Sequence, residues 1–247
     1  MDHHTLASIS IAGSCLDVLG SLYLAYDLLG GPHGPLRLLT RAVTYSILFG
    51  LGYGLGLGLL FGVASGLALG ITIAIELNRM SRVKDHYSLL WESVFSAIRA
   101  AAFGAALYPE VGIRFAALYA GLLTVGQVIA YTRGVRPSLN YSAALKPRFS
   151  GPGIRATLLR TAGYTAAALL CSTFVRHVNH PWLFALRLGL VTGVVTGAGM
   201  TFSPYVEYYA DNLPARRMGV VGVALIFCGF ALQSVQYWLT LFDVHLS

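Results

Sequence analysis

Charged side chains inside apolar stretches are the residues of this sequence best suited to chemistry. Asp17 lies near the middle of the first apolar stretch, and Glu92 and Arg99 share a later one. A charge at bilayer depth costs about 2.5 kcal/mol or more, so such residues mark ion paths, proton relays or structural ion pairs. Glu92 and Arg99 share a helical face but lie too far apart to touch along a straight helix. Each is therefore expected to meet a partner on a neighbouring helix.

Two further acidic residues follow glycine-rich apolar stretches. Glu76 ends one such stretch and Glu207 follows another. A gate for cations and a solvated helix end explain these positions equally well. The candidates for a transport path are therefore Asp17, Glu76, Glu92, Arg99 and Glu207.

Other kinds of chemistry find little support in the sequence. A phosphate-binding glycine loop followed by Lys-Ser or Lys-Thr does not occur, and His177 and His180 lack nearby acidic or cysteine partners. No Ser–His, Asp–Asp or haem-ligating arrangement can be assembled at membrane depth. We therefore expect no metal and no cofactor, and an enzyme is the least favoured class of function.

The most distinctive pattern is a small residue at every fourth position. The first series contains Gly50, Gly54, Gly58, Gly62, Gly66 and Gly70, and a second contains Gly189, Gly193 and Gly197. Glycine allows helix backbones to approach closely in lipid, where no hydrophobic force drives helices together. The glycines predict close helix packing within the chain, in a homo-oligomer, with other membrane subunits, or along a narrow path.

The composition indicates that lipid is the solvent for much of the chain. The 247 residues are 56% hydrophobic and 11% charged, with a mean hydropathy of +0.67. So much apolar surface exceeds what one soluble core could bury. We predict an all-α, polytopic integral membrane bundle of about seven helices, with eight as the alternative. The apolar stretches are Thr5–Leu29, Ala42–Ile75, Tyr87–Leu107, Val111–Tyr131, Ala156–Val175, Pro181–Tyr205 and Gly219–Phe242.

The stretch Ala42–Ile75 is too long for one ordinary span. A continuous helix there would be about 50 Å long against a hydrocarbon core of about 30 Å. Two short spans would place a turn without polar residues in lipid, where backbone groups would lack hydrogen bonds. One long helix that protrudes from the membrane is therefore favoured over two spans.

Basic residues between the apolar stretches predict the orientation. With seven spans, the loops containing Arg79, Arg133–Arg155 and Arg216 all lie on one side, which the positive-inside rule makes cytoplasmic. This places the N-terminus inside, in an inner (cytoplasmic) membrane, whereas Arg37 and Arg41 fall on the wrong side. The net charge of +7 is then explained by membrane lipids as partners and not by nucleic acid.

An internal echo suggests a duplication. Residues 57–66 and 188–197 share the pattern L-G-L-[LV]-x-G-V-x-[ST]-G, and Glu76 and Glu207 follow at the same separation. Drift toward low-complexity sequence in glycine-rich helices is the alternative. The predicted organisation is a three-helix unit at 1–110, a linker helix and basic loop at 111–155, and a parallel three-helix unit at 156–247. This plan is known among transporters, as an analogy of fold only.

The function that these features favour is a small transporter or channel, with the glycine-rich helices packed around a polar path. The alternative is a non-catalytic membrane subunit or scaffold whose glycines dock partner helices in a larger complex.

Overall fold

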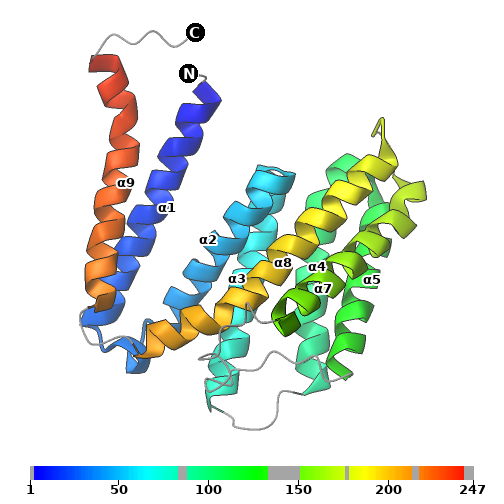
Figure 1. Cartoon of the computed structure of the whole chain (residues 1–247), viewed down its shortest axis with the longest axis horizontal. Coiled ribbons are helices and arrows are strands. Elements are labelled where there is room, and N and C mark those ends of the chain that lie inside the picture. Colours follow the sequence, from blue (N-terminus) through cyan, green and yellow to red (C-terminus); the bar gives the residue numbers. More distant parts are fainter. Residues whose placement is uncertain (1–2, 83–87, 133–150, 176–177, 213–216, 242–247) are drawn as a thin grey trace. The chain divides into compact units, whose positions relative to one another are not determined.

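The protein is helical in all the ranges that the computed structural model describes. These are residues 3–82, 88–132, 151–175, 178–212 and 217–241. Only the backbone is described at 3–5, 8, 32, 80–82, 151–153, 156, 200–212, 236 and 239–241. Figure 1 labels the long helices. In chain order they are α1 (His3–Leu28), α2 (Arg37–Leu57), α3 (Leu59–Arg82), α4 (Leu89–Val111), α5 (Ile113–Thr132), α7 (Gly151–Cys171), α8 (Pro181–Asn212) and α9 (Arg217–Leu241); short 3-10 turns occupy Gly31–His33 and Ser172–Phe174.

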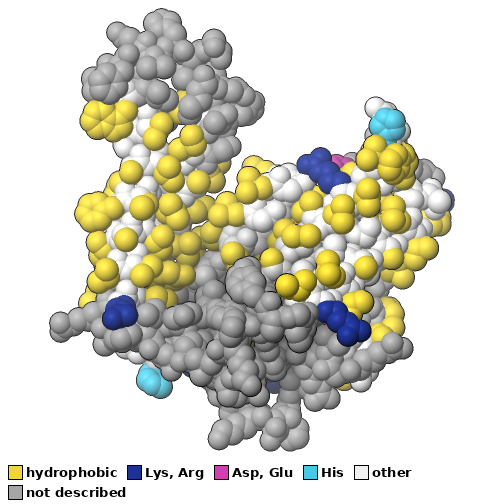
Figure 2. Space-filling model, viewed as in Figure 1, with side chains coloured by type: hydrophobic (Ala, Val, Ile, Leu, Met, Phe, Trp, Pro, Cys, Tyr) yellow, Lys and Arg dark blue, Asp and Glu magenta, His cyan; other side chains and the backbone are white. Residues whose placement is uncertain are grey.

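Seven of these helices are long and apolar enough to cross a membrane, namely α1, α2, α3, α4, α5, α8 and α9. Large hydrophobic side chains cover much of the face seen in Figure 2. Leu55, Leu90 and Phe227 are 87%, 69% and 72% exposed, respectively, as suits side chains that face lipid. The predicted all-helical, polytopic membrane fold is confirmed. Helix α7, which covers most of the predicted span at 156–175, is not among the seven.

The prediction of one long helix over Ala42–Ile75 is wrong. The helix breaks at Gly58, whose φ of 104° lies in a region that L side chains rarely adopt. The Gly58 amide still donates to the Gly54 carbonyl, and the Gly62 amide to the Gly58 carbonyl, each at 3.0 Å. Arg187 adds hydrogen bonds of 2.8 and 3.0 Å to the Gly56 carbonyl oxygen. These hydrogen bonds satisfy several backbone groups at the turn and so lower the cost that argued against a turn in lipid.

The first glycine series closes the hairpin that this turn creates. A methyl group added at Gly66 would lie 2.7 Å from the Cα of Gly50, and one at Gly62 would lie 2.6 Å from the Cα of Gly54. Because the contacted residue number falls as the number along α3 rises, α2 and α3 are antiparallel. Packing within the chain, one of the alternatives predicted for these glycines, accounts for this series.

The second glycine series closes another antiparallel pair, between α7 and α8. Methyl groups added at Gly189, Gly193 and Gly197 would overlap Thr165, Thr161 and Thr157 of α7, respectively. Helix α8 also contacts α2, because a methyl group at Gly52 would lie 2.9 Å from Val195. Glycines on both hairpins thus bring backbones together where larger residues would hold them apart.

The chain divides into two compact units, which we describe separately. The first comprises Met1–Thr40 and Tyr209–Ser247, and the second comprises Arg41–Tyr208. In the first unit α1 and α9 lie side by side (Figure 1), since a methyl group added at Gly13 would lie 2.8 Å from the Gly229 carbonyl oxygen. The division at 1–110, 111–155 and 156–247, with its parallel repeats, stays a prediction.

Aromatic side chains form the core of the second unit. Tyr53 packs edge-on against Phe61 and Phe103, at centroid separations of 5.5 and 5.3 Å. The Tyr53 hydroxyl lies 2.7 Å from the Thr196 hydroxyl of α8. These contacts join α2, α3, α4 and α8 and so position the polar residues on α3 and α4.

Candidate functional site

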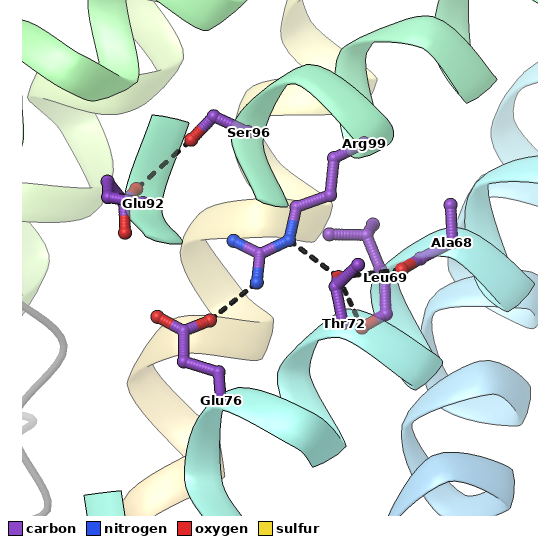
Figure 3. A network of polar contacts seen from close by, with 7 residues as sticks. All are labelled: Ala68, Leu69, Thr72, Glu76, Glu92, Ser96 and Arg99. Carbon is purple, nitrogen blue, oxygen red and sulfur yellow. Dashed lines mark hydrogen bonds and ion pairs between the residues drawn. The ribbon is translucent and has the colours of Figure 1, made fainter. Parts of the chain in front are cut away.

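A buried ion pair joins α3 to α4 in the second unit (Figure 3). Arg99 Nη2 lies 2.5 Å from Glu76 Oε2, and these side chains are 10% and 4% exposed. Arg99 Nε donates a hydrogen bond of 2.7 Å to the Thr72 hydroxyl, which donates in turn to the Ala68 carbonyl at 2.6 Å. Two polar groups on consecutive turns of α3 therefore fix the guanidinium.

This pair supplies the partner that was expected for Arg99 on a neighbouring helix. Glu76 is only 3% exposed, and α3 continues beyond it to Arg82. Glu76 therefore does not lie at a solvated helix end, which was one of the two explanations offered for its position in the sequence. Removing one member of such a buried pair would leave an uncompensated charge, which costs about 3–5 kcal/mol.

Glu92 is a second buried carboxylate, 4% exposed, in the first turn of α4. Its Oε1 accepts a hydrogen bond of 3.1 Å from the Ser96 hydroxyl one turn later. The free backbone N–H groups of the first helical turn carry partial positive charge, which favours a carboxylate there. Position on the helix thus offsets part of the cost of burying Glu92.

A cavity of about 360 Å³ lies beside these carboxylates. Its walls come from α3, α4, α5 and α7, and its charged lining residues are Glu76, Glu92, Arg99 and Arg160. Apolar residues, among them Leu122, Leu159 and Ala167, form the rest of the wall with Gln127 and Tyr164. The volume is in the range of small-molecule sites, which are mostly apolar with a few placed polar groups.

Two glycines keep this cavity open. Gly126 on α5 and Gly163 on α7 line it, and a methyl group added at either would meet nothing within 4 Å. These glycines differ from those of the two series, which, apart from Gly58 at the turn, lie against a neighbouring backbone or side chain. Larger side chains would enter the cavity instead of separating helices.

Glu76 lines this cavity, and one of its two carboxylate oxygens is not bonded to Arg99. Glu76 Oε1 is buried and has no hydrogen-bond partner among the residues that the structure describes. In Figure 3 it points away from Arg99, toward the side on which Glu92 lies. An unsatisfied buried acceptor of this kind costs about 1–3 kcal/mol or more, and a ligand that donates to it would recover that cost.

A smaller cavity of about 30 Å³ continues from the larger one. Both are lined by Arg99, Leu123, Gln127 and Tyr164, and the smaller one reaches Thr196 of α8. Its volume is sufficient for a water molecule. Polar groups therefore extend from the carboxylates toward the hydroxyl pair of Tyr53 and Thr196.

The other predicted site residues are not in this cavity. Asp17 belongs to the first unit, where its Oδ2 accepts a hydrogen bond of 2.6 Å from Gln233 Nε2 of α9. Glu207 lies in α8, where its side chain is outside the described residues. The structure thus brings Glu76, Glu92 and Arg99 together out of the five candidates for a transport path.

Several residues that line the cavity or contact Arg99 were not identified as site residues from the sequence. Thr72 is neutral, and it lies one helical turn before Glu76, which is the only signal that could have drawn attention to it. Arg160 and Gln127 line the cavity. Gln127 joins two helices as well, because its Nε2 donates a hydrogen bond of 2.6 Å to the Tyr164 hydroxyl of α7.

The described residues contain no group of three or more His, Cys, Asp or Glu side chains that could hold a metal ion. Comparisons with protein-family models, with curated proteins and with solved structures found no match to this chain.

Proposed function

We propose that the protein is a membrane transporter for a small organic solute, which binds in the 360 Å³ cavity. The observation that carries this proposal is a Glu76 oxygen for which the described residues supply no hydrogen-bond partner, close to a second buried carboxylate in a largely apolar cavity. Ionisable residues are retained inside membrane helices mainly for substrate or ion paths. An ion pair serving stability alone would not require an adjoining cavity.

The position of the cavity along the helices supports a transport path. Its residue on α3 lies near the end of that helix, those on α5 lie in the second half, and those on α4 lie in the first half; its residues on α7 lie around the middle of that helix. The ends of α3 and α5 border the basic connections after Arg79 and Thr132. The cavity extends from that side to Arg99, deep in α4, as a vestibule open to one face of the membrane would.

The division at Gly58 changes the orientation that the basic residues favour. If α7 also crosses, the chain has eight spans, and the basic connections after α1, α3, α5 and α8 each follow an odd number of crossings. All four connections then lie on the side of the membrane opposite the N-terminus. Helix α7 has 21 residues, about 30 Å, and packs along α8, which supports its crossing. Arg37 and Arg41 then join the other basic residues in the cytoplasm, and the N-terminus lies outside. We adopt this orientation in place of a cytoplasmic N-terminus.

The scaffold alternative depended on glycines that remain available to partner helices. Apart from Gly58 at the turn, the glycines of both series are in contact with other helices of the same chain, so we favour transport.

Solute flux into proteoliposomes tests the proposal. We would screen a panel of amines, amino acids, carboxylates, sugars and inorganic ions. The wild-type protein is expected to carry at least one solute, and Gly163→Leu to reduce its flux to background by filling the cavity. Gly121→Leu is the matched control, because Gly121 is also open but does not line the cavity.

Glu92→Gln is expected to impair this flux, whereas Glu110→Gln on the same helix should not, since Glu110 is exposed. Flux that Gly163→Leu leaves unchanged, or the absence of flux across the whole panel, would refute the proposal.

A further inference from the structure

We propose that the cavity selects a small molecule bearing an ammonium group, whose positive charge is held by Glu76 and Glu92. This inference deepens the proposed transport function by naming the class of solute, and as a substrate class it rests on that function. It also makes a claim about binding that can be tested separately.

The charges on the α3 and α4 walls favour a cation. Arg99 uses Nη2 on Glu76 Oε2 and Nε on Thr72, so the cationic group there is already engaged by protein partners. Glu76 Oε1 has no partner among the described residues, and the carboxylate of Glu92 lines the same cavity. An ammonium group offers several N–H donors and a charge opposite to that of both carboxylates.

The size and lining of the cavity favour an organic cation over a bare metal ion. An alkali or alkaline-earth ion is held by six or so closely spaced oxygen atoms. This cavity has about 360 Å³ of space, and much of its wall comes from Leu122, Leu159 and Ala167. An apolar body attached to the ammonium group would fill the volume beside Gly126 and Gly163, which a small ion would leave empty.

The remaining charged lining residue restricts the class further. Arg160 lies on the α7 wall. A purely anionic solute could approach Arg160 but would face the two carboxylates of the opposite wall. A zwitterion keeps the ammonium group at Glu76 and Glu92 and directs its carboxylate to Arg160. Amines and amino acids therefore share the group that the site selects.

Binding in lipid nanodiscs tests this inference with four probes of similar shape: 2-phenylethylamine, 2-phenylethanol, phenylacetate and phenylalanine. We expect the amine to bind roughly tenfold to hundredfold more tightly than the alcohol, as charge-assisted hydrogen bonds imply, and phenylacetate not to bind. Phenylalanine binding at least as tightly as the amine also supports the ammonium site. Binding of each probe to nanodiscs that contain Gly163→Leu, whose cavity is filled, measures how much of the probe partitions into the lipid.

Variants assign the effect to the carboxylates. Glu92→Gln should bring the affinity for the amine close to that for the alcohol, while Glu110→Gln leaves it unchanged. Glu76→Gln is expected to act in the same way, and Glu92→Gln keeps the test decisive if Glu76→Gln does not fold. Equal binding of amine and alcohol, preference for phenylacetate, or competition by sodium without amine binding would overturn the inference.

The outcomes separate this inference from the proposed function. Flux of a sugar or carboxylate that depends on Gly163, with no amine binding, would leave transport intact and refute the ammonium site. Amine binding that depends on Glu92, without flux of any solute, would leave the binding site and refute transport.

Discussion

Arg99 illustrates how a single residue in a membrane helix serves both stability and the site. Its guanidinium contacts two α3 residues, Thr72 and Glu76, and one edge of it lines the cavity. Arg99 bonds to one carboxylate oxygen of Glu76, and the other oxygen is left available to a ligand. The ion pair therefore positions the acceptor that we assign to the substrate, in addition to joining the helices.

We expect Arg99→Met to destabilise the protein by about 3–5 kcal/mol, because Glu76 would remain buried without its counter-charge. The double variant with Glu76→Leu should recover most of this loss, since apolar residues often replace a buried ion pair without net cost. Thermal unfolding in detergent, arranged as a double-mutant cycle, measures the coupling. Arg114→Met, at an exposed arginine, is the control and should leave the midpoint unchanged. Additive losses in the double variant would contradict the coupling.

At this scale the sequence identified the charged members of the site but not their arrangement. Glu92 and Arg99 stood out because charges are rare in apolar stretches. The pairing of Arg99 with Glu76 could not be predicted, because it depends on how α3 rotates against α4. Thr72 and Ser96 carry no charge, and hydroxyl side chains are too common in helices to mark a site.

At the scale of helices, the first glycine series is symmetric about its turn. Gly54 and Gly62, Gly50 and Gly66, and Ser46 and Gly70 are equally distant from Gly58 along the chain, and these are the pairs in contact. A regular spacing on both sides of a flexible glycine therefore encodes a hairpin. The sequence analysis found the spacing but not the turn, because Arg187 of α8, distant in sequence, binds the carbonyl of Gly56.

Gly66→Ala should destabilise this hairpin by about 1–3 kcal/mol, the usual range for overpacking. The added methyl group would lie 2.7 Å from Gly50 Cα and from the Ser46 carbonyl oxygen, and neither backbone atom can move aside without separating the helices. Gly121→Ala, where nothing lies within 4 Å, should change stability by at most about 1 kcal/mol. Chemical or thermal unfolding of both variants in one detergent provides the comparison. Equal stability of the two would show that α2 and α3 do not approach as described.

At the scale of the whole molecule, composition sufficed to predict a helical membrane protein of about seven spans. Seven helices in the described part of the chain are long and apolar enough to span a membrane, but they are not the seven stretches predicted: residues 42–75 contribute to two of them, and α7 is not among them. Hydropathy measures each stretch separately, and so it could not detect a break that contains no polar residue. Each additional crossing reverses the side of the membrane on which all later connections lie. A single unrecognised turn therefore changes the orientation that the basic residues favour.

Cysteine labelling distinguishes the two orientations at the connection between α1 and α2. We would place single cysteines in a background without Cys15, Cys171 and Cys228, and treat cells with a membrane-impermeant maleimide. His33→Cys is expected to react only after permeabilisation, because the eight crossings that we propose would put this exposed position in the cytoplasm with Arg37 and Arg41. Glu110→Cys, between α4 and α5, should react in intact cells and shows that the reagent reaches outer residues. Labelling of His33→Cys in intact cells would restore the cytoplasmic N-terminus and require that residues 42–75 cross the membrane only once.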